Sequence, residues 1–246
     1  MINFNLNFLQ TCSSTNDVAI KKAKEGLPEG SSYLAYLQTN GRGRDNNQWQ
    51  SLEGNLFLST ILRPVKNKNY WHQLSIIIGF SIIEILIILG IKKSDIELKW
   101  PNDVLVLDKK ISGILLETFD NFIVAGVGLN INKNPQNDKK WITTKLNDHT
   151  KNDYTNKFIA NLLLKNIFKN YVIWQEQGFK FFKKKINHKI KNINKKIIVE
   201  FNSNLNNVSG IFLGLGDDGS LKIKVGEEYF EYYSVESFYF PDKELS

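Results

Sequence analysis

The sequence contains a single cysteine, Cys12, among its 246 residues. One thiol can form neither an internal disulfide nor a cysteine-based metal cage, which fits a reducing cytosol and leaves stability to packing. The first ten residues, MINFNLNFLQ, also lack the basic leader, long apolar stretch and small-residue cleavage site of an export signal. We therefore expect a cytoplasmic protein.

Other absences exclude whole classes of chemistry. The three histidines, His72, His149 and His188, lie far apart with no metal-ligand spacing. The chain has no Walker A loop and no GxSxG elbow, and no motif beside Cys12 would activate its thiol. Covalent catalysis by an enzyme nucleophile is therefore unsupported.

Arginine is scarce although the formal net charge is +7, because the chain has 29 lysines and three arginines. The lysines are scattered among asparagine and isoleucine, which indicates a general compositional bias rather than a DNA-binding surface. The densest basic run, residues 180–196, is typical of the solvated face of a helix and its exit. Binding of nucleic acid or an acidic protein stays an alternative. We expect any DNA binding to be weak, salt-sensitive and independent of sequence.

Hydrophobic residues at 42% and charged residues at 23% are ordinary globular values. The longest apolar segment, residues 74–91, is about as long as a bilayer requires. Glu84 would lie at the centre of such a span, where an ionisable group is costly. We therefore predict a buried helix that Gly90 ends, and the membrane span is the less favoured alternative.

The central part of the chain predicts short strands joined by tight turns at 108–109 and 120–121. Hairpins favour a mixed, largely antiparallel sheet and disfavour a Rossmann fold. Residues 14–16 are typical of a helix N-terminus, and residues 155–182 predict one or two long helices. The expected strands cover residues 33–38, 56–62, 96–99, 104–107, 112–118 and 122–130.

From about residue 193 the pattern changes to short alternating runs, clearest in LKIKV at 221–225. Turn signals at 217–219 and 226–228 bracket that run. About fifty residues of this kind predict a small accessory β-barrel. We expect a catalytic domain over residues 1–190 and the barrel over residues 191–246.

The segment 38–49, QTNGRGRDNNQW, concentrates the scarce arginines, with Arg42 and Arg44 each preceded by glycine. The guanidinium fork suits a carboxylate or a phosphate, and glycine lets the backbone approach an anion closely. We expect a polar loop that closes over an anionic ligand, with Trp49 available for stacking. A plain surface loop or an RGG-like nucleic-acid tail is the alternative.

Four further segments carry weaker signals. Asn102 and Asp103 follow a proline turn, where they could hold a metal-bound nucleotide. Lys110 opens a strand, so its ammonium could point inward, and Gly113 leaves room for a ligand. Asn130 ends a glycine-containing strand and could contact an adenine or ribose edge. The hydroxyls and helix-start N–H groups of residues 14–16 suit a small polar group as well as ordinary capping.

In chain order these segments resemble the biotin protein ligase family, specifically the biotin–[acetyl-CoA-carboxylase] ligases. The matching motifs are CSSTN at 12–16, GRGRDNNQW at 41–49, GNLFLS at 54–59, KWPND at 99–103, KKISGILLE at 109–117 and GVGLNI at 126–131. The resemblance implies an α/β fold like that of class II aminoacyl-tRNA synthetases, followed by an SH3-like barrel. It also implies activation of biotin with MgATP to biotinyl-5′-AMP and transfer to a lysine of a biotin carboxyl carrier domain.

The resemblance also implies roles for individual residues. Lys110, Arg42, Arg44 and Asp103 are the implied catalytic residues, and Asp103 is also the implied magnesium ligand or a partner that orients Lys110. Biotin would be bound by Ser14, Thr15, Asn16, Gln38, Gly41, Arg42, Gly43, Arg44, Lys110 and Gly113. ATP or the adenylate would be bound by Arg42, Arg44, Trp49, Asn102, Lys110 and Asn130.

The sequence departs from the family pattern in three places. About eleven residues precede Cys12, too few for the DNA-binding module of repressor relatives, so we expect a monofunctional enzyme. Residues 45–47 read Asp-Asn-Asn where many relatives are more basic. The C-terminal part has no arginine, so any basic contact to ATP from there would use Lys222, Lys224 or another lysine. A lipoate ligase or octanoyl transferase, and a homodimer, stay open alternatives.

Overall fold

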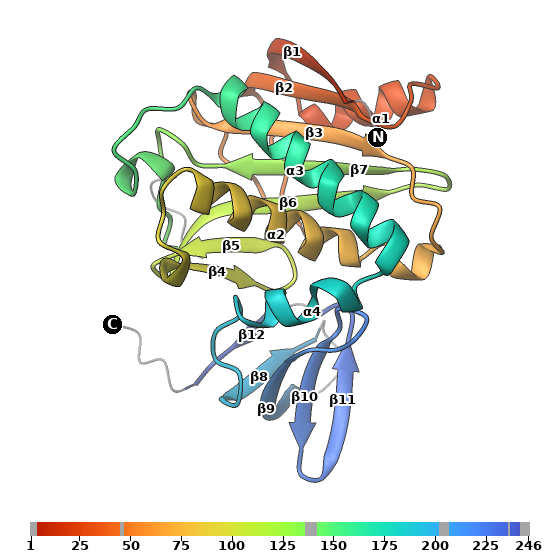
Figure 1. The fold of residues 1–246 in the computed structure, drawn as a ribbon, viewed down its shortest axis with the longest axis vertical. Helices are drawn as coiled ribbons and strands as arrows, with labels where there is room; N and C mark the ends of the chain where they lie inside the picture. The colour runs from red at the N-terminus through yellow and green to blue at the C-terminus, as the bar shows by residue number, and fades with distance from the viewer. Residues whose placement is uncertain (1–3, 45–46, 136–141, 202–206, 236, 242–246) are drawn as a thin grey trace. The chain divides into compact units, whose positions relative to one another are not determined.

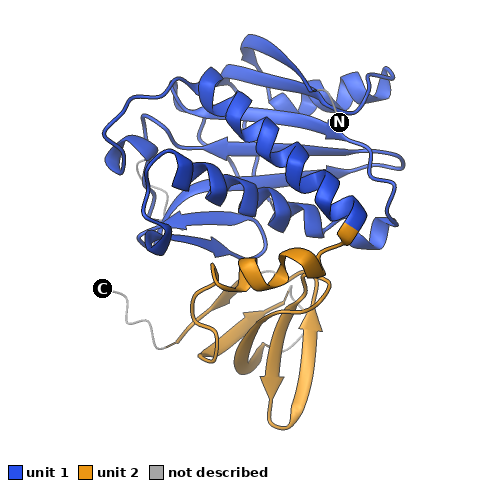
Figure 2. Ribbon diagram, viewed as in Figure 1, with its two compact units in different colours: residues 1–176 blue, residues 177–246 orange. Residues whose placement is uncertain are grey.

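A computed structural model describes all of the chain except residues 1–3, 45–46, 136–141, 202–206, 236 and 242–246. The chain divides into two compact units, residues 1–176 and 177–246 (Figure 2). The long apolar segments belong to the first unit and the alternating runs to the second. The predicted division at residue 190 stays a prediction about where the catalytic domain ends.

The first unit is built on a seven-stranded sheet in the order β1-β2-β3-β7-β6-β5-β4 (Figure 1). Only the β1–β2 pair is parallel, and the other pairs are antiparallel. This confirms the predicted mixed, largely antiparallel sheet. The strands are β1 (Asn5–Cys12), β2 (Ser31–Gln38), β3 (Leu56–Leu62), β4 (Ile96–Lys99), β5 (Asp103–Val106), β6 (Lys109–Thr118) and β7 (Ile123–Leu129).

The edge strand β1 is the element that the sequence pattern did not predict. Its NLNFLQTC segment has little apolar continuity, and most of its residues are exposed or half-buried. A parallel neighbour requires a crossover connection, which α1 (Thr15–Lys24) supplies between β1 and β2. Ala19 and Ala23 of α1 pack against Ile61 and Val124, so this helix covers one face of the sheet.

The opposite face is covered by α2 (Gln73–Ile88), with α3 (Asn156–Gln177) beside it (Figure 1). Helix α2 is apolar on nearly all sides, and almost all of its residues are accordingly buried. Glu84 is tolerated there because its Oε2 accepts hydrogen bonds from Asn166 at 2.9 Å and Asn170 at 2.8 Å. No helix within the described residues is long and apolar enough to cross a bilayer.

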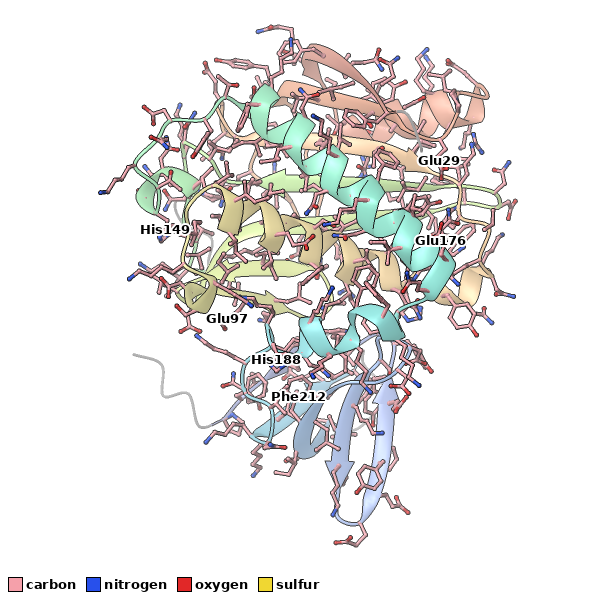
Figure 3. The ribbon with its side chains drawn as sticks, viewed as in Figure 1. Glu29, Glu97, His149, Glu176, His188 and Phe212 are labelled. Atoms are coloured by element: carbon pink, nitrogen blue, oxygen red, sulfur yellow. The ribbon has the colours of Figure 1, made fainter. Side chains whose placement is uncertain are left out.

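Helix α3 is also tied to the end of the sheet. Glu29, labelled in Figure 3, accepts the hydroxyl of Tyr171 at 2.6 Å and the backbone N–H of Arg63 at 2.7 Å. Burial raises the pKa of Tyr171, so the phenol stays protonated and donates this bond. Short 3₁₀ helices at Lys68–Tyr70, Lys93–Asp95 and Leu146–Asp148 complete the unit.

The boundaries of β5 and β6 differ from the prediction. The turn between them is formed by Leu107 and Asp108, which have φ of 49° and 63°, rather than by residues 108–109. Strand β6 therefore begins at Lys109, three residues earlier than expected. Lys110 is thus a strand residue whose direction is set by β6.

The second unit begins with the end of α3 and α4 (Lys180–Asn187) and continues as a five-stranded antiparallel sheet in the order β11-β10-β9-β8-β12. The exposed basic run lies on α4 and after it, although Lys189 is buried. Within the described residues no pairing joins β11 to β12, so the sheet is open and the predicted closed barrel is not confirmed. The strands are β8 (Lys196–Glu200), β9 (Val208–Leu215), β10 (Leu221–Val225), β11 (Glu228–Tyr232) and β12 (Ser237–Tyr239).

The polar contact between α2 and α3 can be tested by changing Asn170 to alanine. The substitution removes a buried donor to both Ser81 and Glu84, so we expect the free energy of unfolding in urea to fall by about 1–3 kcal/mol. Asn161→Ala is the matched control, because Asn161 donates to the Lys157 carbonyl of its own helix, and it should change the value by less than about 0.5 kcal/mol. Equal losses from the two variants would contradict this account.

Candidate functional site

The candidate site lies on the face of the central sheet that carries α1. On β6, the side chain of Ile114 points toward α2, where it lies close to Gly79. Because successive side chains alternate, Gly113, Leu115 and Glu117 share the other face. The register places Gly113 opposite Gly128 and Leu115 opposite Gly126, so the middle of this face is lined by small residues.

A cluster of buried and half-buried polar side chains, the polar cluster, forms where α1 begins. The backbone N–H and the hydroxyl of Thr15 both donate to Oε1 of Gln38, at 2.8 and 3.0 Å. Oγ of Ser59 lies 2.7 Å from Oγ1 of Thr15 and 2.5 Å from Oδ1 of Asn16. Ser14 is the buried N-cap residue, but its side chain makes no capping bond. Its hydroxyl is thus not committed to the helix end.

The close approach of Asn16 explains a glycine in β7. A Cβ atom on Gly126 would lie 2.3 Å from Oδ1 of Asn16. Any larger residue would therefore push the start of α1 away from the sheet. Ser59 was not among the predicted site residues, although a serine within the buried LFLSTIL strand is a signal for a satisfied internal contact.

The glycine-rich loop folds back on itself over its described residues. Gly43 N–H donates to the Asn47 carbonyl at 2.7 Å, Trp49 N–H donates to the Gly41 carbonyl at 3.0 Å, and Arg42 forms an antiparallel bridge with Gln48. Gly41 is required because a Cβ there would lie 2.6 Å from the Trp49 carbonyl oxygen. Closure of the loop over a ligand stays a prediction.

Arg42 is paired with two carboxylates. Its Nη2 lies 2.7 Å from Oδ1 of Asp17 and 3.2 Å from Oε1 of Glu117. The hydrogen bond from Arg42 lowers the pKa of Asp17 and, reciprocally, raises the pKa of Arg42. Neither Asp17 nor Glu117 was among the predicted site residues, because a long-range ion pair leaves no local sequence pattern.

An open pocket of about 650 Å³ lies between the loop and β6. This volume suits a small organic ligand. Both loop arginines line the pocket. Asp45 and Asn46, where the sequence departs from the family pattern, fall outside the described residues. The lining residues are Asn40, Gly41, Arg42, Gly43, Arg44, Asn47, Gln48, Leu115 and Glu117.

Trp49 packs on Gly113 and Gly128, which lie opposite each other in β6 and β7 and form a glycine ledge on the sheet. A Cβ atom on Gly128 would lie 2.4 Å from Cε2 of its indole, and one on Gly113 would lie 3.0 Å from Cζ3. The ammonium of Lys110 lies 5.6 Å from the centre of a Trp49 ring, within cation–π range. The loop is thereby brought next to the predicted catalytic lysine.

Lys110 and Asp103 form a largely buried pair. Nζ of Lys110 lies 2.8 Å from Oδ1 of Asp103, and the two side chains are 15% and 10% exposed. Asn102 lies beside them but donates its amide to the Ile114 carbonyl at 2.9 Å. The inward direction predicted for Lys110 agrees with this burial, while its catalytic role stays a prediction.

Asn130 has partners inside the protein. Its amide donates to the Thr144 carbonyl at 3.0 Å, and Oδ1 of Asn55 accepts the backbone N–H groups of residues 131–133. Asn130 is 1% exposed. In this conformation it joins two loop segments, and contact with an adenine stays a prediction.

Asp103 is the predicted ligand of a magnesium ion. No cluster of three or more His, Cys, Asp or Glu side chains that could hold a metal ion occurs within the described ranges. Mg²⁺ bound with a nucleotide needs only one or two protein carboxylates. The buried Oδ1 of Asp103 contacts Lys110 without forming a directed hydrogen bond, so this carboxylate fits such a shared ion.

One face of the sheet thus combines a buried polar cluster, a glycine ledge and paired cations. Buried hydroxyl and amide groups recognise polar atoms of a ligand, while guanidinium and ammonium groups attract its acid or phosphate. The protein has an α/β fold, and this arrangement is what a site for small molecules that carry negative charge would require.

Comparison with known proteins identifies the family. The sequence pattern of the Biotin/lipoate A/B protein ligase family matches residues 8–134. The chain belongs to this family. It is 28% identical over 242 residues to the bifunctional ligase/repressor BirA of Bacillus subtilis, covering 91% of this chain and 70% of that protein.

Two other relatives are named as biotin ligases. The biotin–[acetyl-CoA-carboxylase] ligase of Mycobacterium tuberculosis is 30% identical over 169 residues, covering 68% of this chain and 63% of that protein. The biotin protein ligase of Aquifex aeolicus, solved in complex with biotin and ATP, superposes with a TM-score of 0.82 at 32% identity. That match covers 96% of this chain and 99% of the Aquifex chain.

The packing of Trp49 can be tested with alanine at the two ledge glycines. Gly128→Ala would bring a methyl group within 2.4 Å of the indole, and Gly113→Ala only within 3.0 Å. We expect Gly128→Ala to displace Trp49 and to speed tryptic cleavage after Arg42 and Arg44 by roughly tenfold. Gly113→Ala should have a smaller effect, and mass spectrometry of the fragments measures both. Unchanged cleavage in Gly128→Ala would show that the indole does not hold the loop.

Proposed function

We propose that this chain is a biotin protein ligase, an enzyme that joins biotin to a lysine of a biotin carboxyl carrier domain at the expense of ATP. The observation that carries the proposal is the placement of the polar cluster at Thr15 and Gln38, the cations Arg42 and Lys110, and the glycine ledge on one sheet face. Membership of the family and the likeness to the Aquifex enzyme support it.

We assign biotin recognition to the polar cluster. The ureido ring of biotin carries N–H donors and a carbonyl acceptor, and Ser14, Thr15 and Gln38 offer both kinds of partner. Gly41, Gly43 and Gly113 would let the backbone and the sheet approach the ligand. Each buried polar atom left unpaired would cost about 1–3 kcal/mol. The polar cluster would therefore distinguish biotin, by hydrogen bonding, from ligands that leave its polar atoms unpaired.

The first half-reaction joins two anions. A carboxylate oxygen of biotin attacks the α-phosphorus of ATP, the bond from that phosphorus to the bridging oxygen breaks, and pyrophosphate leaves. Arg42, Arg44 and Lys110 would neutralise the charge that gathers on the biotin carboxylate and the α-phosphate. Asp103 would hold Lys110 in place and share Mg²⁺ with ATP, and that ion would neutralise charge on the phosphates.

The second half-reaction needs no enzyme nucleophile. The neutral amine of the carrier lysine attacks the acyl carbon of biotinyl-5′-AMP, the acyl–oxygen bond to AMP breaks, and the amine loses a proton. Trp49 would cover the adenylate, and Asn102 and Asn130 would border the nucleotide. The consumption of ATP favours the cytoplasm as the place where this reaction occurs.

The second unit is inferred to be an SH3-like domain. Five short antiparallel strands support this inference, and a closed barrel would require β11 and β12 to meet. Lys222 and Lys224 are engaged within this unit. They pair with Glu231 and Glu227, each at 3.3 Å.

Alanine substitution of the two cations tests the chemistry. Lys110→Ala and Arg42→Ala should each lower the rate of biotin-dependent ATP–pyrophosphate exchange by about 100-fold or more, because each removes charge stabilisation in the transition state. Lys109→Ala, which changes the exposed neighbour of Lys110, is the matched control and should retain the activity. Exchange within about twofold of wild type would remove the substituted residue from the catalytic set.

Direct assay of the product tests the overall reaction and its substrate. The protein, MgATP and biotin should add one biotinyl group to a carrier domain, detected by mass spectrometry, and a carrier with its acceptor lysine changed to arginine should stay unmodified. Biotin should also raise the melting temperature of the protein more than lipoate does. Preferential stabilisation by lipoate together with lipoyl transfer would favour the lipoate ligase alternative.

A further inference from the structure

Arg42 is held through one of its three nitrogens. Nη2 donates to Oδ1 of Asp17 at 2.7 Å and lies 3.2 Å from each carboxylate oxygen of Glu117. A guanidinium has five N–H donors, so Nε and Nη1 carry the other three. Within the described residues neither Nε nor Nη1 of Arg42 donates a hydrogen bond. The two carboxylates therefore anchor one corner of the guanidinium and leave its other donors for a ligand.

Glu117 is itself fixed by the buried part of the site. Nδ2 of Asn16 donates to Oε2 of Glu117 at 2.6 Å, and Oδ1 of Asn16 lies 2.5 Å from Oγ of Ser59. Asn16 is 3% exposed and Ser59 is fully buried. A continuous chain of hydrogen bonds thus runs from β3 through the start of α1 and β6 to the loop. These hydrogen bonds fix the position of Arg42 relative to the sheet, although Arg42 itself lies on a loop.

We infer that Glu117 is a positioning residue for Arg42: together with Asp17 it fixes Nη2 so that Nε and Nη1 face the carboxylate of biotin. This inference rests on the proposed function for the identity of the ligand. Arg42 and Glu117 both line the 650 Å³ pocket, so the anchored guanidinium lies at the wall where a ligand would enter. Glu117 acts through Arg42 and touches no reacting atom.

Simple electrostatics makes the opposite prediction, which allows a sharp test. Asp17, Glu117 and Arg42 together carry a net charge of −1, and this charge repels an incoming carboxylate. If the acidic residues merely competed with biotin for Arg42, removing one of them would strengthen biotin binding. If they orient the guanidinium, removing one of them weakens biotin binding. The side chain of Arg42 must then be ordered when biotin binds, and this ordering costs conformational entropy.

Glu117→Gln is the informative variant, because its amide oxygen can still accept from Asn16 while the charge that holds Arg42 is lost. Glu25→Gln is the matched control, since Glu25 forms an exposed ion pair with Lys22 at 2.7 Å. In biotin-dependent ATP–pyrophosphate exchange, Glu117→Gln should raise the KM for biotin by about tenfold and the KM for ATP by less. Glu25→Gln should leave both constants unchanged.

A double-mutant cycle tests whether Glu117 acts through Arg42. In an Arg42→Lys background, Glu117→Gln should produce no further loss of biotin affinity measured by calorimetry. The melting temperature without ligand should be the same for Glu117→Gln and Glu25→Gln. An unchanged or lower KM for biotin in Glu117→Gln, or additive losses in the cycle, would overturn the inference.

A measurement without substrates separates this inference from the proposed function. The chain has only three arginines, so arginine labelled with ¹⁵N gives few guanidinium signals, and Arg42→Lys assigns one of them. Separate, slowly exchanging Nη signals are expected for Arg42 in the wild type, with faster rotation in Glu117→Gln and in Asp17→Asn. Rotation that is already free in the wild type would refute the positioning role even if biotin transfer occurs. An anchored Arg42 in a protein without biotin-dependent exchange would instead refute the proposed function.

Discussion

The contact of Ser59 with Thr15 and Asn16 is the constraint on which the rest of the site depends. It places the start of α1 against a buried strand, at 2.7 and 2.5 Å from the serine oxygen. Hydroxyl and amide groups buried at this depth must find partners, so the contact has little freedom to vary. Gly126 is needed to admit Asn16, and Gln38 meets Thr15 because β2 runs beside the crossover helix. The polar cluster is therefore a consequence of how the β1-α1-β2 crossover docks on the sheet.

The cations of the site are stable before any anion arrives because each has an internal carboxylate partner. Lys110 is paired with Asp103 in a largely buried contact, and Arg42 is paired with Asp17 and Glu117. An unpaired buried charge would be costly, whereas a paired charge can be held ready at a defined position. The carboxylates thus serve the folded state, and an anionic ligand then meets donors that are already oriented.

The sequence predicted the elements whose signal is local. The buried strands from β2 to β7, helix α2 and the helical spacing of α3 follow from periodicity and turn residues, and the motifs gave Thr15, Gln38, Arg42 and Lys110. Strand β1 was not predicted because an edge strand with exposed side chains lacks a strong alternation. Glu117 and Ser59 were not predicted as site residues because their partners lie 75 residues away at Arg42 and 43 residues away at Asn16. Long-range hydrogen bonds are set by strand order, which local patterns do not encode.

The position of Trp49 indicates how a ligand would alter the loop. Its indole rests on Gly128 and Gly113, yet its Nε1 is buried without a hydrogen-bond partner among the described residues. An unpaired buried donor of this kind costs about 1–3 kcal/mol. The packing of the loop on the ledge is therefore less stable than its contact area suggests. A ligand that offers an acceptor to Nε1 would remove this cost. A ligand that binds on the glycine ledge and displaces the indole would also remove it, provided that Nε1 finds an acceptor in its new position. Binding of a ring system on the glycine ledge would consequently be coupled to rearrangement of the arginine loop through the side chain of Trp49.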